Sequence, residues 1–348
     1  MKVLVLHAYS ATNAGDGLLV EETIGLLREA FVACDITVAA LHPGTFDLPS
    51  VTVIDAAPSW KGFSRDFRRT LKSLSSFDLV VGVGGGYIRA GHPVEALKMA
   101  VTHGYQLMKA SRTSVPVVYL PQSIGPLRFG VLPWAQYFLR RINRVYLRDD
   151  RSITELKLDN AVRIQDLATM TGEYVDRADH SVNPKPVLSV RAVRGNISNP
   201  VKDLAVAIGS FDGYVQSRGA GNDDTAAMSS LGPETTLSRE QLLSSRGQRR
   251  VVIAVRLHAA LMAINAGHWV VHLAYERKGF GAFDDLGLPD YVFNVNSFDV
   301  DEVRSLVEGL LHDPDRRLEY DKRLKASRSG ATAARSRLIG EIQQLAKA

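Results

Sequence analysis

Cysteine is almost absent from this chain of 348 residues, and long apolar runs are missing altogether. The single Cys34 cannot form an internal disulfide or a cysteine-based metal site, which is compatible with a reducing cytoplasm. No stretch approaches about 18 uninterrupted apolar residues, so no segment is expected to span a membrane. The apolar run at residues 1–7 lacks the longer core and cleavage site of a signal peptide. We therefore expect a cytoplasmic protein.

A strong excess of either charge is also missing. The chain has 42 Lys and Arg residues against 37 Asp and Glu, a formal net charge of +5 with neutral histidines. This small, dispersed excess argues against a nucleic-acid partner and suits an anionic small substrate or an anionic membrane surface. The basic stretch Lys61 to Lys72, next to Trp60, is interpreted as a solvated helix face. The alternative is an acceptor-facing or membrane-facing surface, which would bring the protein to the inner membrane face as a peripheral contact.

Metal-ligand patterns are absent from the histidines. His7, His92, His103, His268 and His272 have no cysteine or carboxylate partners at ligand spacing. We therefore predict no metal site.

The hydrophobic pattern alternates short apolar runs with helical segments. The length suits two domains of about 150 to 200 residues each. Strand-like runs occur at Val3–His7, Ile36–Leu41, Val51–Ile54, Asp78–Val83, Pro116–Leu120, Val145–Leu147, Val187–Val190, Val251–Val255, Trp269–Leu273 and Tyr291–Val295. Fully apolar strands separated by helices indicate parallel sheets covered on both faces. The predicted fold class is α/β, with two Rossmann-like domains whose parallel sheets face a central cleft.

A proline-rich join at Pro184–Pro186 indicates the domain boundary. It gives an N-terminal domain at 1–183 and a C-terminal domain at 184–348, the latter closing with helices from Asp301 to Ala346. The polar stretch Gly219–Glu234 is predicted to be an exposed loop, and no clear strand is predicted between Asp203 and Arg250.

Ligands of open parallel sheets bind off the carboxyl ends of the strands, and two glycine-containing turns fall there. Asn13, Gly15 and Asp16 follow the first strand; the polar side chains can cap the next helix, and glycine lets the backbone approach a ligand. Gly84–Gly86 follow another strand, where glycines allow either close approach or a tight turn. For both turns, a purely structural role is the alternative to ligand binding.

Two further strand exits carry polar side chains. Gln122 follows the strand ending at Leu120, and Arg148 follows the strand at Tyr146. An Arg–Asp pair in Arg148–Ser152 is as often a structural brace as a ligand contact, and Asp150 and Ser152 are candidate helix caps.

The most informative segment lies in the second half. Arg256 and His258 close an apolar strand and open a helix, and Lys278 follows the next strand, one helix-plus-strand unit later. All three should lie at one edge of the sheet beside a helix N-terminus, which is a favourable place for an anion.

Taken together, these motifs resemble the polysaccharide pyruvyl transferase family. The resemblance runs from Asn13 to about Pro289. It is carried by Asn13–Asp16, Gly84–Gly86, Gln122–Leu127, Arg148–Ser152, Arg256–Ala259 and Tyr275–Lys278. It implies a GT-B-like fold and transfer of pyruvate from phosphoenolpyruvate, as a ketal, to a cell-surface polysaccharide or its lipid-linked precursor. It also implies that Arg256, Leu257 and His258 form a donor-binding and acid–base segment. Arg148, Arg191 and Lys278 match further functional positions.

The mechanism expected from this resemblance needs no cofactor, because phosphoenolpyruvate is itself the donor substrate. Arginine and lysine would hold its carboxylate and phosphate, and His258 would transfer protons. The N-terminal domain would take the sugar or lipid-linked acceptor, and the C-terminal domain the donor. One alternative is a GT-B glycosyltransferase that uses a nucleotide sugar, with Glu276 on the ribose. Another is a non-catalytic carbohydrate-binding or assembly partner. The sequence does not indicate an oligomeric state.

Overall fold

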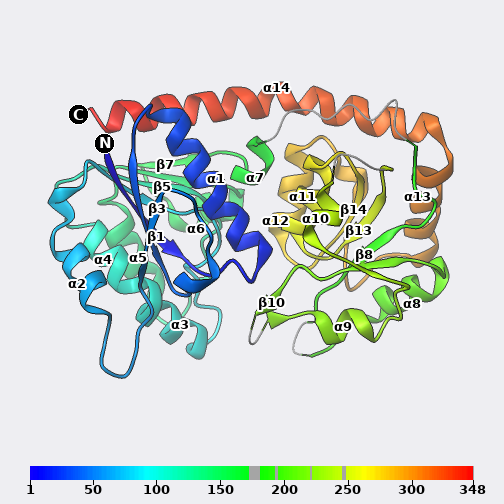
Figure 1. Ribbon diagram of the computed structural model, residues 1–348, viewed down its shortest axis with the longest axis horizontal. Helices are drawn as coiled ribbons and strands as arrows, with labels where there is room; N and C mark the ends of the chain where they lie inside the picture. Colours follow the sequence, from blue (N-terminus) through cyan, green and yellow to red (C-terminus); the bar gives the residue numbers. More distant parts are fainter. Residues whose placement is uncertain (172–180, 193–194, 220–221, 245–247, 348) are drawn as a thin grey trace. The chain divides into compact units, whose positions relative to one another are not determined.

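The chain forms two compact units in the computed structural model (Figure 1), which describes residues 1–171, 181–192, 195–219, 222–244 and 248–347. Unit 1 comprises Met1–Ala11, Asp16–Leu167 and Ala333–Ala348, and unit 2 comprises Thr12–Gly15 and Ala168–Thr332. The join predicted between 183 and 184 follows residues 172–180, which lie outside the described residues. The boundary between the two compact units lies earlier in the chain, between Leu167 and Ala168.

Unit 1 contains a parallel sheet in the order β3-β2-β1-β4-β5-β6-β7. Its strands are β1 (Lys2–Ala8), β2 (Asp35–Ala40), β3 (Val51–Asp55), β4 (Leu79–Gly82), β5 (Val117–Gln122), β6 (Arg144–Leu147) and β7 (Ala161–Arg163). Its helical segments are α1 (Ala14–Ala30), η1 (Pro43–Thr45), α2 (Arg65–Lys72), η2 (Leu74–Ser76), α3 (Pro93–Met99), η3 (Ala100–Gly104), α4 (Tyr105–Ala110), α5 (Val131–Leu139) and α6 (Asp150–Leu156); α7 (Leu167–Met170) begins at the boundary. The strand order reverses between β1 and β4, as in a Rossmann sheet.

Burial on both faces explains the apolar strands of unit 1. Every residue of β4 and β5 is buried, as the continuous apolar pattern predicts for parallel strands between helices. The helix α2 adds Phe67 and Leu71 to the same core while its other positions face solvent. Burying each such side chain contributes about 1.5–3 kcal/mol.

Unit 2 repeats the same topology in the order β12-β9-β8-β13-β14-β15, again entirely parallel. Its strands are β8 (Val187–Ser189), β9 (Asp212–Tyr214), β12 (Thr236–Leu237), β13 (Val251–Ala254), β14 (Trp269–Ala274) and β15 (Val292–Asn294); β10 (Arg218–Gly219) and β11 (Asn222–Asp223) form a separate antiparallel pair. Its helical segments are α8 (Asn199–Ile208), α9 (Thr225–Ser229), α10 (Arg239–Leu243), α11 (Leu257–Asn265), α12 (Arg277–Asp285), η4 (Pro289–Tyr291), α13 (Val300–His312) and the first part of α14 (Pro314–Leu345). The reversal falls between β8 and β13.

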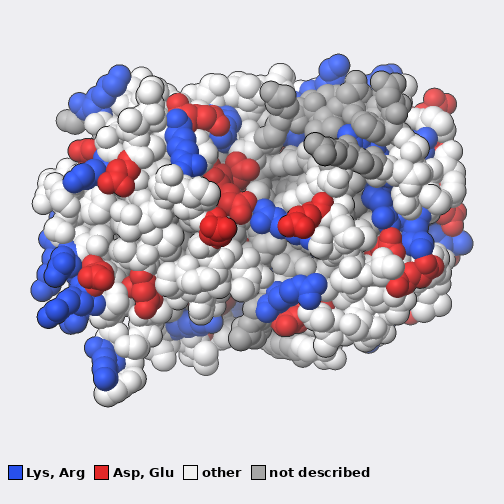
Figure 2. Space-filling model, in the orientation of Figure 1, with Lys and Arg blue, Asp and Glu red and all other residues white. Residues whose placement is uncertain are grey.

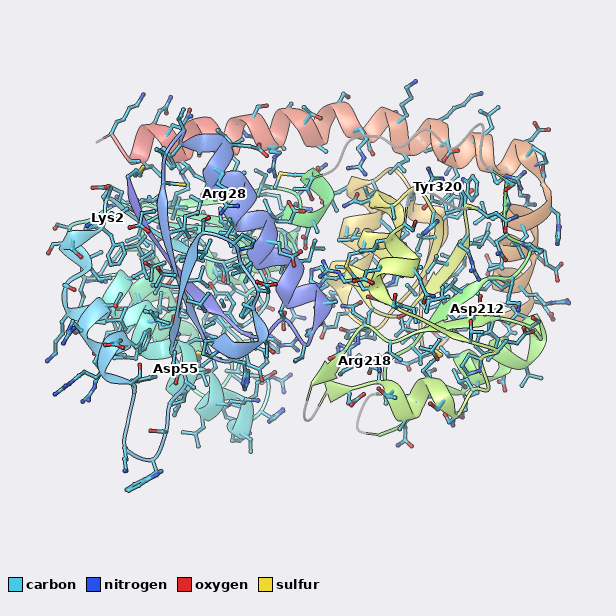
Figure 3. All side chains as sticks on the ribbon, viewed as in Figure 1. Lys2, Arg28, Asp55, Asp212, Arg218 and Tyr320 are labelled. Atoms are coloured by element: carbon cyan, nitrogen blue, oxygen red, sulfur yellow. The ribbon has the colours of Figure 1, made fainter. Side chains whose placement is uncertain are left out.

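The structure between Asp203 and Arg250 differs from the sequence prediction. It contains β9 and β12, so the prediction of no clear strand is wrong. The sequence of β9, Asp212-Gly213-Tyr214, hides the strand because an acidic residue and a glycine break the apolar pattern. Burial alone would raise the pKa of the Asp212 carboxyl, but hydrogen bonds from Arg250 and Thr235 hold this pKa below its usual value (Figure 3).

The predicted exposed loop at Gly219–Glu234 is also partly wrong. It contains α9, and the side chains of Asp224 and Met228 are buried. A Cβ at Gly213 would meet Met228 Sδ at 2.7 Å, so the glycine of β9 makes room for this helix. Because this stretch is mostly polar, its sequence gives no indication that part of it packs into unit 2.

The last helix, α14, begins in unit 2 and ends in unit 1, with the change between Thr332 and Ala333. In unit 2, the Tyr320 hydroxyl accepts a hydrogen bond from Val270 N at 3.2 Å (Figure 3). In unit 1, Tyr146 Oη donates to Glu341 Oε2 at 2.5 Å, and Leu338 and Ile342 are fully buried. Across the residues that the structure describes, no helix has the length and apolarity needed to cross a bilayer.

Candidate functional site

The site begins where the strand order of unit 2 reverses, because the crevice beside a topological switch point is the usual ligand site of such sheets. Arg191 lies two residues beyond β8, and His258 is the second residue of α11, which follows β13. Lys278 is the second residue of α12, which follows the neighbouring β14. The structure therefore places these three predicted residues at one edge of one sheet.

His258 lies against the backbone of Gly15. A Cβ added at Gly15 would be 2.5 Å from His258 Nδ1, so only glycine leaves room for the imidazole. His258 as a residue is partly exposed, although its Nε2 is buried, and the neighbouring Arg256 and Leu257 are buried. Two segments that lie far apart in the sequence, the turn around Asn13–Gly15 and the start of α11 with His258, thus meet in unit 2.

Gln216 joins this group and was missed in the sequence. Its backbone carbonyl accepts from Ala14 N at 3.2 Å, and its Nε2 donates to Asn13 Oδ1 at 3.4 Å. Asn13 Oδ1 also accepts from Gly15 N at 3.2 Å, which caps the start of α1 as predicted. These bonds fix the turn that supports His258. Asp16 follows in unit 1, partly exposed in the first turn of α1, where an acidic side chain is favoured by the helix dipole.

Arg256 forms a buried ion pair with Asp224, a second residue missed in the sequence. Arg256 Nε donates to Asp224 Oδ2 at 2.5 Å, and both side chains are at least 95% buried. The pair connects the N-cap position of α11 with the N-cap position of α9. The ion pair of the Arg256 guanidinium with Asp224 therefore holds the segment around His258 in place.

A second cluster of charges surrounds Tyr275 at the exit of β14. The Arg191 guanidinium lies over the Tyr275 ring at 4.4 Å, and Lys278 Nζ is 6.0 Å from the same ring. Lys278 Nζ also pairs with Glu276 Oε2 at 2.9 Å. Because β13 lies between β8 and β14, the contact from Arg191 to Tyr275 reaches across the strand that leads to His258.

Several buried polar atoms at this edge have no hydrogen-bond partner among the described residues. They are Ser189 Oγ at the end of β8, Arg191 Nε, Gln216 Oε1 and Ser217 Oγ. Buried polar groups are usually paired, so a concentration of unpaired donors and acceptors indicates where a polar ligand would bind. Ser189 and Ser217 carry no sequence signal that distinguishes them from other serines.

The glycines after β4 in unit 1 have local packing reasons. A Cβ at Gly84 would lie 2.8 Å from the Pro121 carbonyl oxygen, and Gly85 has φ +146°, a conformation that favours glycine. Gly85 N donates to Pro121 O and Gly85 O accepts from Ser123 N, which joins this turn to the exit of β5. Gly86 is more open, because the atoms nearest to a Cβ added there would be Ser123 O at 3.7 Å and Arg148 Nη2 at 3.9 Å.

Arg148 is a buried brace between loops of unit 1. Its Nη1 pairs with Asp166, and its Nε donates to Ser123 Oγ at 3.0 Å. The cap of α6 is Asp149, whose carboxylate accepts from Ser152 N at 2.8 Å, so Asp150 is not the cap. Asp166 is the partner that the sequence did not indicate.

Gln122 lies next to an aromatic and histidine cluster in unit 1. Gln122 is fully buried, and its Oε1 has no hydrogen-bond partner among the described residues. His7 stacks on Tyr87 at 4.5 Å, hydrogen-bonds Tyr119 Oη at 2.8 Å, and approaches His103 Nδ1 at 3.3 Å. His7 has φ 70°, an uncommon left-handed conformation at the end of β1.

Burial keeps both histidines of this cluster neutral. It lowers the pKa of His7 well below its usual value, with a further contribution from His103. Burial, followed by the charge of Lys98, lowers the pKa of His103 to about 3. In unit 2, burial lowers the pKa of His272 to about 4.

No group of three histidine, cysteine or acidic side chains suited to a metal ion occurs in the described part of the chain.

The paired Rossmann-order sheets define the class of fold. HepE of Anabaena, solved with UDP and glucose, aligns over 99% of this chain and 97% of its own at a TM-score of 0.57 and 12% identity. The spinosyn forosaminyltransferase SpnP aligns over 100% of both chains at the same TM-score and identity. TcCGT1, solved with UDP, aligns over 99% of both chains at a TM-score of 0.52 and 10% identity. The protein has the two-domain α/β fold of GT-B glycosyltransferases.

The sequence places the chain within this class more narrowly. A model of the polysaccharide pyruvyl transferase family matches residues 13–277, and the chain belongs to that family. No curated protein sequence matches the chain. The matched range includes Asn13 at one end and Arg256, His258 and Glu276 toward the other; Lys278 lies one residue beyond its end.

Proposed function

We propose that this protein transfers the pyruvyl group of phosphoenolpyruvate to a pair of sugar hydroxyls as a ketal. The acceptor is a cell-surface polysaccharide or its lipid-linked precursor. Family membership supports a transferase of polysaccharide biosynthesis. The observation that carries the donor assignment is the gathering of Arg191, His258 and Lys278 at the switch point of unit 2.

The donor is a small trianion, and its charges match the cations at this edge. Arg191 offers a guanidinium whose buried Nε has no partner among the described residues, and Lys278 adds a point charge. Leu257, whose side chain is buried, would contribute its backbone N–H at the start of α11, where amides are free to bind an anion. Arg256 would add positive charge while its pair with Asp224 keeps it in place. Glu276 would orient Lys278.

His258 is assigned the proton transfers. Protonation of the methylene carbon of phosphoenolpyruvate makes the adjacent carbon electrophilic, and one sugar hydroxyl attacks it and loses its proton. The bond from that carbon to the bridging oxygen then breaks, and phosphate departs with the electron pair. The second hydroxyl adds to the same carbon and loses its proton to the departing phosphate, which closes the ketal. Histidine can donate the first proton and accept one from a hydroxyl, because its usual pKa is near neutrality. Such general acid–base catalysis contributes about 10²–10⁴-fold.

The acceptor side is assigned to residues nearer the exits of unit 1. Asp16 would offer a carboxylate to sugar hydroxyls, Gln122 a buried amide oxygen, and Gly86, the one partly exposed residue of the Gly84–Gly86 turn, its backbone. Asn13 would position Gly15 beside His258 in unit 2, and Arg148 would support the Gly84–Gly86 turn in unit 1 through its contact with Ser123. The donor carries its own leaving group, so the proposal requires no cofactor.

A nucleotide-sugar transferase is the second candidate, because HepE and TcCGT1 share the fold and were solved with UDP. Glu276 would then hold the ribose. Thermal-shift titration separates the candidates, since a ligand at 100 times its Kd stabilises the folded state by about 2.7 kcal/mol. We expect phosphoenolpyruvate to raise Tm in a concentration-dependent manner. Lys278→Ala should weaken this shift, whereas Lys202→Ala, at an exposed position of α8, should not.

Other outcomes would contradict the donor assignment. Stabilisation by nucleotide sugars alone would identify the glycosyltransferase instead. No shift with either compound would favour a non-catalytic carbohydrate-binding or assembly protein.

A further inference from the structure

Unit 1 exposes an apolar and basic surface that takes no part in the proposed reaction. Trp60 is 90% exposed, and Val94, Leu97 and Val101 are 71%, 68% and 46% exposed. Large apolar side chains that gather on a surface usually mark an interaction site. These four residues and the basic side chains around them form what we call the Trp60 surface.

The Trp60 turn is closed by its own hydrogen bonds. Ser59 and Gly62 exchange backbone hydrogen bonds of 3.1 and 2.9 Å, and Ser59 Oγ also donates to Gly62 O at 2.6 Å. Gly62 has φ 88°, which closes the turn. At its base, Ser64 Oγ donates to Asp55 O at 2.7 Å, close to the labelled Asp55 in Figure 3. The structure thus holds a tryptophan out in solvent at the tip of a fixed projection, although exposure of that ring is unfavourable.

The helical stripe lies along the segment from α3 to α4. Val94, Leu97 and Val101 are spaced by three and four residues, so they share one helix face. The segment continues to Tyr105, whose ring stacks on Phe63 at 5.3 Å. Because Phe63 directly follows the Trp60 turn, this contact ties the turn to the stripe. Both lie toward the lower end of unit 1 in Figure 1.

Basic side chains flank these apolar groups. Lys61 lies over the Trp60 ring at 4.7 Å, and Lys98 is exposed within the stripe. On α2, Phe67 and Leu71 face the core, which turns the basic residues outward. The exposed basic residues of that helix are Arg65, Arg68, Arg69 and Lys72, and none forms an ion pair with a described residue. Figure 2 shows these charges as a blue group over α2, with a further basic residue on the projecting turn.

We propose that the Trp60 surface docks on an anionic lipid bilayer. Tryptophan prefers the boundary between headgroups and acyl chains, and aliphatic side chains gain by burial in that layer. Lysine and arginine around them would face anionic headgroups, each contributing about 1 kcal/mol near such a membrane. A lipid surface uses the basic and the apolar side chains together. An acidic protein partner would satisfy the charges as well, and failure to bind the vesicles described below would favour it.

Cosedimentation with vesicles tests this surface without any enzymatic readout. We expect the wild-type protein to bind vesicles that contain phosphatidylglycerol, more strongly at low salt than at high salt, and to bind phosphatidylcholine vesicles weakly. Trp60→Ala combined with Leu97→Ser should lower the affinity at least tenfold. Arg68→Gln with Arg69→Gln should lower it about thirtyfold at low salt, as expected for two surface charges, and flatten the salt dependence. Val206→Ser, at an 82%-exposed residue of α8, is the matched control.

Two results would overturn the proposal. One is the absence of binding to phosphatidylglycerol vesicles at low salt. The other is binding that Trp60→Ala with Leu97→Ser leaves unchanged. Failure of this surface would not affect the donor assignment, because the same variants can be assayed for phosphate release with a water-soluble acceptor.

Discussion

At the scale of single residues, the Arg256–Asp224 pair decides how the segment around His258 is held. The two side chains are buried together, and removing one partner of a buried pair leaves an uncompensated charge. We expect Asp224→Asn to lower the free energy of unfolding by about 3–5 kcal/mol, measured by urea denaturation. The double variant Asp224→Leu with Arg256→Met should be less destabilised, because no charge remains buried. A loss below about 1 kcal/mol in Asp224→Asn would mean that the pair does not form.

Gly15 offers a direct test of how closely the turn approaches His258. An added Cβ would stand 2.5 Å from His258 Nδ1, so Gly15→Ala must displace the imidazole or the turn. Since displacements of about 1 Å can cost on the order of 100-fold in rate, we expect kcat for phosphate release to fall at least tenfold. Gly25→Ala is the control, because nothing lies within 4 Å of a Cβ there. Wild-type activity in Gly15→Ala would separate the turn from the histidine.

His103 should contribute to loss of stability in acid. Its pKa is about 3 in the folded protein, below the usual value of about 6.5 expected after unfolding, so the unfolded chain takes up a proton first as pH falls. The stability is complete above pH ~6.5 and declines below it, by about 1.4 kcal/mol per pH unit for each such histidine. We expect His103→Gln to show a shallower decline of unfolding free energy between pH 6.5 and 4 than wild type. His312→Gln, at an exposed position, should leave the slope unchanged; an unchanged slope in His103→Gln would contradict the buried neutral state.

Residues whose positions follow from strand exits could be predicted from the sequence. Arg191, His258 and Lys278 could be placed together because parallel strands end at a common edge. Asp224 and Gln216 could not be found in this way. Their partners lie 32 and more than 200 positions away, and polar side chains in a Gly-, Asp- and Ser-rich stretch give no sign of burial. The site role of each residue remains a prediction.

At the scale of elements, the fully apolar strands were predictable and the short polar ones were not. The predictions for β4, β13 and β14 are confirmed because parallel strands buried on both faces need continuous apolar sequence. In β9, Asp212 is stabilised by Arg250 and Thr235, which are distant in sequence. Tertiary hydrogen bonds therefore override a local pattern that indicates a loop.

The end of α14 makes a testable contribution to unit 1. Leu338 is fully buried there, whereas Leu318, earlier in the same helix, is 54% exposed. We expect Leu338→Ala to lower the free energy of unfolding by about 2–5 kcal/mol, through lost burial and the cavity left behind. Leu318→Ala should change it by less than about 0.5 kcal/mol. Equal effects of the two substitutions in urea denaturation would show that the last turns do not pack on unit 1.

At the scale of the whole molecule, two sheets of the same strand order arise from one repeated pattern of buried strands and covering helices. The α/β class and the two Rossmann-like units could be predicted because that pattern is local and recurs along the chain. Which segments of the chain make up each unit could not be predicted. Residues 12–15 belong to unit 2 and the end of the chain to unit 1, through contacts that no sequence spacing encodes.

Phosphate release from phosphoenolpyruvate tests the proposed role of His258 in the transfer reaction. With a panel of sugar acceptors, we expect wild-type protein to release phosphate only when a suitable diol is present and to yield a pyruvylated sugar by mass spectrometry. His258→Ala should remain folded and lose at least 100-fold in rate, while His312→Ala keeps wild-type activity. Activity of His258→Ala within about twofold of wild type, as judged against that 10²–10⁴-fold range, would contradict the account.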